Sequence, residues 1–276
     1  MKKFQLKKNE ITEQKSSGQE VPEFAKFKIP SKFKNLDAKI SSTLKLSVSV
    51  ELKGKPSHPW SSKIGGHPYL PVGTEYPSVK KVRPLFLLAQ INFEEMPSLP
   101  DFPEIGILQF FIGDNELYGL DLESPFKSDY KIVYYPEVIQ DKKKLVSDFS
   151  FLPEFTYTPL DAGFEAGMRF RRNAVSMPCN DYRFEDMFPE LSDDYDLCDE
   201  YQEFCGALGT KIGGYPDFTQ EDPRVRKTLK GYELLFQLDS EGEVCWGDMG
   251  VGNFFIKPED LKKKDFSKVL YNWDCT

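Results

Sequence analysis

The sequence predicts an α+β fold that is mainly antiparallel β, with few short helices and an internal duplication of one sheet-rich unit about a pseudo-twofold axis. Three observations support this prediction. A motif at Lys63–Pro68 recurs 148 residues later at Lys211–Pro216. Two further blocks recur in the same order at nearly the same offset. Aromatic residues make up 14% of the chain, which is typical of sheets and dense cores.

The two further blocks are apolar runs. Leu87–Ile91 is echoed by Leu234–Leu238, and Phe110–Ile112 is echoed by Phe254–Ile256. Because blocks repeated in constant order indicate copied supersecondary units, we expect a tandem duplication. One copy alone would leave its apolar strand faces exposed, so we expect the two units to pack as one domain.

The predicted domain organisation has three parts. Residues 1–27 are expected to form a basic, poorly ordered N-terminal arm. Residues 28–154 are the first repeat unit, and residues 155–276 are the second. The second unit carries an acidic insertion, residues 181–206, in which apolar side chains recur at helical spacing.

Individual elements follow from periodicity and turn signals. The clearest strand is Leu44–Leu52, where apolar and polar residues alternate. A short helix is predicted within Pro136–Phe149, and another begins at Pro258 because proline and acidic residues favour a first helical turn. Further strand or hairpin segments are predicted at Leu85–Phe93, Gly106–Ile112, Leu117–Leu120, Ile132–Tyr135, Met168–Arg172, Tyr232–Leu238, Val244–Asp248 and Gly252–Ile256.

Charge and composition narrow the class of protein. The net charge is −8, and no continuous basic stripe of the kind that binds nucleic acid is present. RNA binding through the basic N-terminal arm together with Arg224 and Arg226 therefore fits poorly. No apolar run reaches the length of a membrane span, and none follows the basic start in the manner of an export signal. We expect a cytoplasmic protein whose five cysteines are reduced thiols.

The glycine pairs Gly65–Gly66 and Gly213–Gly214 have two interpretations. They can form turns, since glycine adopts positive φ and the following proline sets the exit direction. Alternatively, a ligand can approach bare backbone N–H groups there, with Lys63 and Lys211 beside it. The prolines that follow Gly66 exclude the helix that a phosphate-binding loop requires.

Two glutamines also have two interpretations. Gln90 and Gln237 each lie inside an apolar strand, where an unpaired amide would cost about 1–3 kcal/mol. Each amide can be a structural group that bonds the Gly-Gly turn of its own or the other repeat. Each can instead be a polar anchor in a binding groove between the repeats.

Catalytic patterns are sparse. The two histidines are His58 and His67. Tyr215 replaces His67 in the second copy of the motif, so the repeated unit does not require an imidazole. The chain contains no Cys-x-x-Cys pair of the kind that binds zinc. We therefore expect no metal and no cofactor, and we assign no catalytic residue. The alternative is an enzyme that acts on a small molecule through carboxylates such as Asp248, which follows Trp246 between glycines.

The Lys-Ile-Gly-Gly-x-Pro motifs, the Leu-Leu-x-Gln strands and the Trp-Gly-Asp to Phe-Phe-Ile ending resemble the YwqG-like family of bacterial proteins of unknown function. That family is more distantly similar to eukaryotic programmed cell death protein 2 and its relatives, which are linked to ribosome assembly and act as protein chaperones. The resemblance implies a duplicated, sheet-rich fold and supplies no catalytic residues.

These observations together favour a non-catalytic module that binds another protein or a peptide and resembles a chaperone in its activity. Neither nucleic acid nor a membrane is expected as a partner, and the sequence does not indicate an oligomeric state. The binding candidates are Lys63, Gly65, Gly66, Gln90, Lys211, Gly213, Gly214, Gln237, Trp246 and Asp248.

Overall fold

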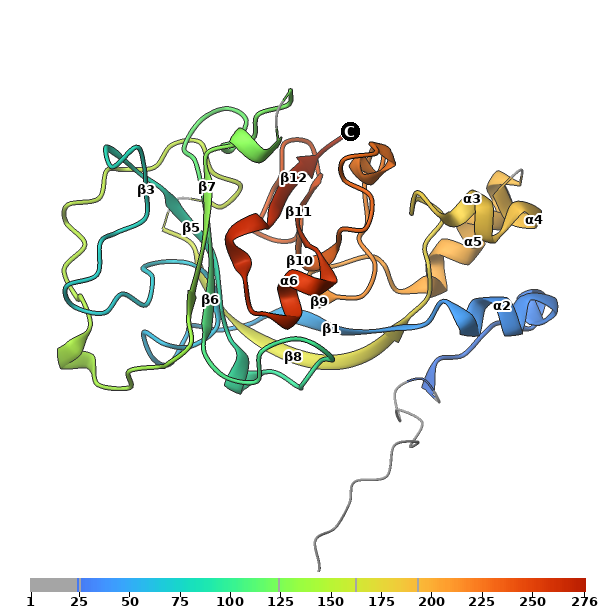
Figure 1. Cartoon of the computed structure of the whole chain (residues 1–276), viewed down its shortest axis with the longest axis horizontal. Coiled ribbons are helices and arrows are strands. Elements are labelled where there is room, and N and C mark those ends of the chain that lie inside the picture. The colour runs from blue at the N-terminus through green and yellow to red at the C-terminus, as the bar shows by residue number, and fades with distance from the viewer. Residues whose placement is uncertain (1–23, 25, 124, 162, 193) are drawn as a thin grey trace, which may run out of the picture.

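In the computed structural model, the described residues form one large, strongly curved sheet with a few short helices (Figure 1). The described residues are 24, 26–123, 125–161, 163–192 and 194–276. Ten strands within them make up the sheet, and every neighbouring pair is antiparallel. The prediction of a mainly antiparallel α+β fold is therefore confirmed.

The strands fall evenly on the two predicted units, residues 28–154 (the first half) and 155–276 (the second half). The first half contributes β1 (Lys45–Leu52), β2 (Lys63–Gly65), β5 (Phe86–Asn92), β6 (Ile107–Ile112) and β7 (Tyr130–Tyr135), with a separate ribbon of β3 (Ser78–Val79) and β4 (Arg83–Pro84). The second half contributes β8 (Glu165–Val175), β9 (Lys211–Gly213), β10 (Glu233–Asp239), β11 (Val251–Ile256) and β12 (Leu270–Asp274).

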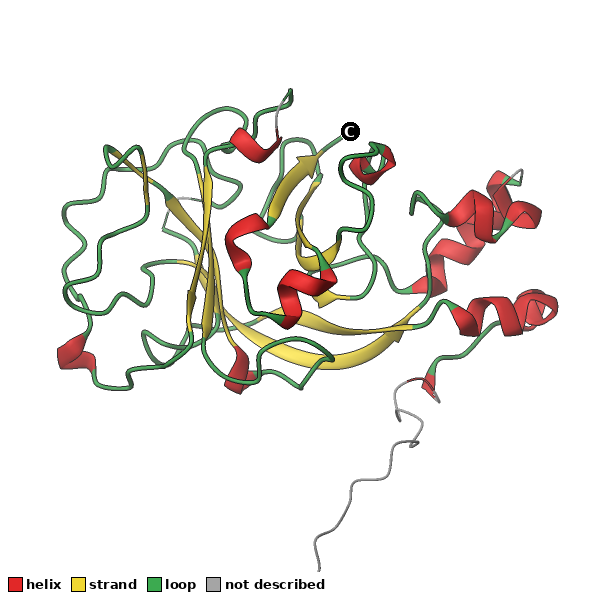
Figure 2. Cartoon of the chain, in the orientation of Figure 1, coloured by secondary structure: helices red, strands yellow, loops and turns green. Residues whose placement is uncertain are grey.

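The helices are short, as Figure 2 shows. The predicted acidic insertion folds into three of them, and the predicted helix at Pro258 is α6. The α-helices are α2 (Asp37–Ser42), α3 (Phe184–Met187), α4 (Pro189–Ser192), α5 (Tyr195–Cys205) and α6 (Pro258–Lys262). The 3₁₀ turns are η1 (Ser31–Leu36), η2 (Phe93–Glu95), η3 (Pro125–Lys127), η4 (Lys142–Lys144), η5 (Pro223–Val225) and η6 (Phe266–Lys268). Most of the predicted N-terminal arm lies outside the described residues.

Two predicted strands are wrong because the backbone turns there. In Leu117–Leu120, Tyr118 and Gly119 both have positive φ, at 49° and 84°, which a strand does not allow. In Val244–Asp248, Gly247 has φ of 55°, and Gly250 donates its N–H to the carbonyl of Trp246 across a tight turn. Both segments are therefore loops that join strands.

The helix predicted within Pro136–Phe149 is also wrong, apart from the single turn η4. Val146 donates its N–H to the carbonyl of Leu70, and Val72 donates to the carbonyl of Lys144. These long-range bonds hold the segment extended against the loop that follows β2. Tertiary pairing therefore overrides the local helical preference.

The order of strands across the sheet is β12-β11-β10-β9-β1-β8-β2-β5-β6-β7. The long strand of each half therefore lies beside the short strand of the other half: β1 pairs with β9, and β8 pairs with β2. β1 and β8 also pair with each other along their whole common length, from Lys45 opposite Val175 to Leu52 opposite Met168. Neither half completes its part of the sheet without a strand of the other.

The curved sheet wraps around a core that both halves share. The ring of Phe110 on β6 lies 4.9 Å from that of Phe236 on β10 and 4.8 Å from that of Phe254 on β11, between ring centroids. The edge strands β7 and β12 also meet, since the rings of Tyr130 and Tyr271 are 5.6 Å apart. In Figure 1, β6 and β7 accordingly face β11 and β12 across this core.

Both Gly-Gly pairs end a short strand with left-handed backbone. Gly65 and Gly66 have φ of 65° and 66°, and Gly213 and Gly214 have φ of 66° and 77°. A Cβ atom at Gly65 would lie 2.3 Å from the carbonyl oxygen of Phe164, so no side chain fits there. The prediction that these glycines form turns with positive φ is confirmed.

Candidate functional site

The amide of Gln90 is a buried structural group. It is 0% exposed and holds the loops on either side of β2. Its Oε1 accepts from the N–H of Tyr69 at 2.7 Å and from Nε2 of Gln109 at 2.8 Å. Its Nε2 donates to the carbonyls of Pro59 and Ser61 at 2.9 and 2.8 Å. The hydrogen-bonding capacity of this amide is used inside the protein.

Gln237 makes the corresponding bonds in the second half. Its Oε1 accepts from the N–H of Asp217 at 2.7 Å, and its Nε2 donates to the carbonyls of Ala207 and Gly209 at 3.2 and 2.8 Å. Each of these three backbone partners stands 148 residues after its counterpart around Gln90. The structural interpretation of both glutamines, in which each holds the segments beside its own Gly-Gly turn, therefore accounts for their burial.

The two motif lysines are both buried but differ in their partners. Lys63 lies opposite Gln90, and Lys211 lies opposite Gln237. The Nζ of Lys63 is 3.3 Å from Oε1 of Glu165. The Nζ of Lys211 has no hydrogen-bond partner among the described residues. Burial lowers the pKa of both ammonium groups, and that of Lys211 falls to about 8.

A groove opens where the short strand β9 ends. β9 stops at Gly213, opposite Ser47 of β1. β1 extends beyond this point to Lys45, and β10 extends to Glu233. Because the chain leaves the sheet at Gly213 and Gly214, β9 does not fill the space between the ends of its two neighbours. The resulting groove has a volume of about 450 Å³.

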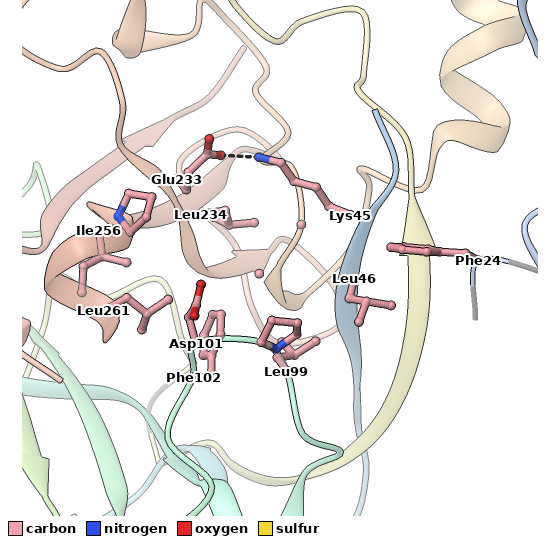
Figure 3. Close-up of a pocket in the computed structure, with 14 residues that line it drawn as sticks. Phe24, Lys45, Leu46, Leu99, Asp101, Phe102, Glu233, Leu234, Ile256 and Leu261 are labelled. Atoms are coloured by element: carbon pink, nitrogen blue, oxygen red, sulfur yellow. Dashed lines mark hydrogen bonds and ion pairs between the residues drawn. The ribbon is translucent and has the colours of Figure 1, made fainter. Parts of the chain in front are cut away.

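The wall of this groove is mostly apolar (Figure 3). Both halves contribute: β1 and the loop after η2 come from the first, and β10, β11 and α6 come from the second. The apolar lining residues are Phe24, Leu46, Leu99, Pro100, Phe102, Leu234, Ile256, Pro258 and Leu261. A Cβ atom at Gly213 would lie 3.3 Å from Cδ1 of Leu99, so a side chain there would narrow the groove.

The charged groups on the wall are paired. Lys45 and Glu233 point toward each other across the groove, with Nζ and Oε2 2.6 Å apart (Figure 3). Burial lowers the pKa of the Lys45 ammonium, and the charge of Glu233 acts in the opposite direction. On the other side, Asp101 lies 3.7 Å from Nζ of Lys262. Among the described residues that line the groove, none is a histidine, cysteine or hydroxyl residue.

Behind Glu233 lies a largely buried ion network that the sequence did not predict. Arg183 bonds Glu233 at 2.9 Å and Asp181 at 2.7 Å. Arg224, which is 0% exposed, bonds Asp181 at 2.9 Å and Asp222 at 2.6 Å. Arg224 was a candidate RNA contact, but its charge is neutralised inside the protein. The network joins the helical insertion to β10.

The remaining candidates lie elsewhere. Trp246 is 0% exposed and packs in the core against Tyr118 and Trp273. Asp248 lies in the exposed turn after it, where its carbonyl accepts from the hydroxyl of Thr276 at 2.9 Å. Neither residue lines the groove.

The structure therefore brings together only part of the predicted set. Gly213 and Gly214 line the groove, whereas Lys63 and Gly66 line two other pockets, both of which also include Glu165 of the second half. The groove's other residues come from five separate stretches of chain, and nothing in their local pattern marks them for binding. Whether the ten candidates bind a ligand stays a prediction.

The described residues contain no group of three or more histidine, cysteine or acidic residues arranged to hold a metal ion. All five cysteines belong to the described residues and are free thiols. None of the helices in the described part of the chain has the length and apolar character that crossing a bilayer needs.

Fold and groove together define a protein with a nearly closed antiparallel sheet and an apolar groove where β9 ends. The family described as "Domain of unknown function (DUF1963)" matches residues 62–275, and the chain belongs to this family. No curated protein matches the chain.

Proposed function

We propose that the protein is a non-catalytic binding module that takes an apolar segment of another protein into the groove at the end of β9. The observation that carries this proposal is a groove of about 450 Å³ with nine apolar lining residues and paired charges. Burial of apolar surface supplies about 25 cal/mol per Å², which is the main driving force for such binding.

The shape and charge of the groove favour a protein segment over a charged small molecule. Lys45 pairs with Glu233 and Asp101 pairs with Lys262, so the wall offers no unpaired charge to an ionic ligand. The groove continues the line of β9 between the ends of β1 and β10, a space one strand wide. In many peptide-binding domains an extended peptide adds a strand to an exposed sheet edge, and pockets for alternate side chains give specificity.

The test is selection from a random peptide library, followed by calorimetry on the selected peptides. We expect enrichment of segments with alternating apolar residues and micromolar affinity. Leu46→Lys, which places a charge on the groove wall, should weaken binding at least tenfold because the lysine must be desolvated. The matched control is Leu208→Lys, at a residue 58% exposed and outside the groove, which should bind normally.

Two outcomes would count against the proposal. One is a library that yields no peptide above background. The other is a selected peptide that binds the Leu46→Lys variant as tightly as the wild type, since the peptide then occupies another surface.

We further infer that the two halves descend from one duplicated unit and that the chain is a YwqG-like member of its family. Three features support this: equivalent hydrogen bonds around Gln90 and Gln237, paired Gly-Gly turns, and a register shift in β5 at Leu87 matched by one in β10 at Leu234. The boundaries proposed for the two units are 28–154 and 155–276, and the proposed location is the cytoplasm.

The exchange of β1 and β8 between the halves implies that neither unit folds alone. Residues 161–276, which include β8 but lack β1, should therefore be insoluble or unfolded when expressed separately. A soluble product with cooperative unfolding would contradict the shared-core organisation.

A further inference from the structure

A second pocket, separate from the groove, contains both histidines of the chain. It has a volume of about 340 Å³ and lies on the first half, between the segment after β1 and the segment after β7. It shares no lining residue with the groove. The polar groups that line it include His58, Lys63, His67, Lys142 and Glu165.

Lys63 is the buried cation of this pocket. Its side chain is 4% exposed, and its Nζ lies 3.3 Å from Oε1 of Glu165, whose side chain is 30% exposed. An ammonium group has three hydrogen-bond donors, and this single long contact leaves capacity for another acceptor. Burial lowers the pKa of Lys63, which indicates that the group is poorly solvated. A poorly solvated cation gains strongly from an added anion.

The two imidazoles are held in place by ring stacking. His67 stacks on Phe149 with ring centroids 4.5 Å apart and planes 7° apart. His58 stacks on Trp60 at 4.8 Å and 14°. Both histidines are exposed, and each neutral imidazole carries one N–H donor. The pocket therefore combines accessible donors with a buried cation.

We propose that this pocket binds a small molecule through an anionic group, either a carboxylate or a phosphate, held by Lys63 with His58 and His67. Two lysines against one carboxylate leave the lining positive when the histidines are neutral. The pocket volume lies at the small end of the range for small-molecule sites. This site is additional to the proposed peptide groove and does not depend on it.

Histidine NMR gives a direct test, because the chain has two histidines and both line the pocket. The full chain is titrated with inorganic phosphate and with acetate, against chloride at equal ionic strength. We expect saturable shifts of both imidazole signals in the millimolar range with at least one of the two anions. The anion that saturates first identifies the preferred group. Shifts that match those with chloride for both anions would overturn the proposal.

Two variants with opposite expected effects on anion affinity distinguish a change in binding from a loss of folding. Lys63→Met should weaken anion binding at least tenfold, because it removes a charge-assisted hydrogen bond. Glu165→Gln should strengthen it about fivefold, because it removes a competing negative charge. Lys211→Met, at the corresponding buried position of the second half, should leave binding unchanged. Equal affinity in wild type, Lys63→Met and Glu165→Gln would overturn the proposal even if all three fold.

Discussion

Lys63 and Lys211 occupy the same place in two copies of one motif, yet their surroundings differ. Each begins a three-residue strand, and each lies opposite a buried glutamine on the neighbouring strand. Lys63 has Glu165 as a partner and borders an open pocket. Lys211 has no hydrogen-bond partner among the described residues, and burial lowers its pKa to about 8.

The connecting segments explain this difference. In the first half, residues 53–62 link β1 to β2 without a helix. In the second half, residues 176–210 link β8 to β9 and include α3, α4 and α5. Cys205, at the end of α5, lies close enough to Lys211 for the two groups to affect each other's pKa. One motif thus gives a buried lysine that borders an open pocket or a buried lysine without a hydrogen-bond partner among the described residues, depending on the connecting segment beside it.

The largest change in the free energy of unfolding is expected in the ion network that anchors the helical insertion. Arg224→Met should lower the free energy of unfolding by about 3–5 kcal/mol, because it leaves the buried carboxylate of Asp222 without its cation and removes one of the two cations that bond Asp181. Urea unfolding measures this change. The matched control, Arg226→Met at an exposed residue of the same basic cluster, should change stability by less than about 0.5 kcal/mol. Equal effects of the two changes would contradict the anchoring role.

The second prediction is a gain in the free energy of unfolding. Lys211→Met should raise the free energy of unfolding at pH 7 by about 3 kcal/mol, since a fall in pKa from 10.5 to about 8 corresponds to roughly 1.4 kcal/mol per unit. Methionine keeps the volume of the side chain and removes the buried charge. Chemical denaturation of both proteins measures the gain. A variant less stable than wild type would show that the ammonium is stabilised by its surroundings.

The pH dependence of this difference provides an internal check. Because the folded pKa of Lys211 is below the unfolded value, the penalty is fully present below about pH 8 and is relieved as pH rises toward 10.5. The stability advantage of Lys211→Met should therefore shrink over this interval. An advantage that stays constant from pH 7 to pH 10.5 would assign the effect to packing.

The third effect compares the two glutamines. Gln90→Met should lower the free energy of unfolding by about 3 kcal/mol and Gln237→Met by about 2 kcal/mol, since buried partners lose their hydrogen bonds. Gln90 is expected to contribute more because it also accepts from Gln109. In the second half, Asn253 stands at the place of Gln109 and donates to the carbonyl of Asp217. Thermal or urea unfolding measures the loss of stability in both variants. A larger loss for Gln237→Met would contradict the expected order.

The smallest effect is expected at the partner of Lys63. Glu165→Gln should change the free energy of unfolding by less than about 1 kcal/mol, because the carboxylate is partly exposed and its ion pair is long. Urea unfolding beside the wild type measures the change. A loss of several kcal/mol would mean that this pair is a structural element of the sheet and not part of an open pocket.

Much of the sheet was predictable from local pattern. Leu44–Leu52 alternates apolar and polar residues, and the structure has β1 there because one face of the strand meets the core. The long apolar runs became β5, β6, β10 and β11. The short strands β2 and β9 were interpreted as turns alone, since three residues carry too little periodicity.

The candidate sites were less predictable. Gly213 and Gly214 were found through their motif, but Lys45 and Glu233 are 188 residues apart and carry no local signal for binding. The burial of Arg224 was not predicted, because the acidic residue that neutralises it from the insertion, Asp181, lies 43 positions earlier. Ion pairs between distant segments are not visible in a window of sequence.

The sequence by itself determined most of the longer strands, where glycine must turn the chain, and which polar groups require buried partners. These properties depend on periodicity and backbone sterics, which act over a few residues. Only the tertiary structure decided that β1 and β8 exchange places, that Lys211 lies near Cys205 at the end of α5, and that a groove remains beyond Gly213. Each of these features depends on how distant segments pack against one another, which local sequence preferences do not determine.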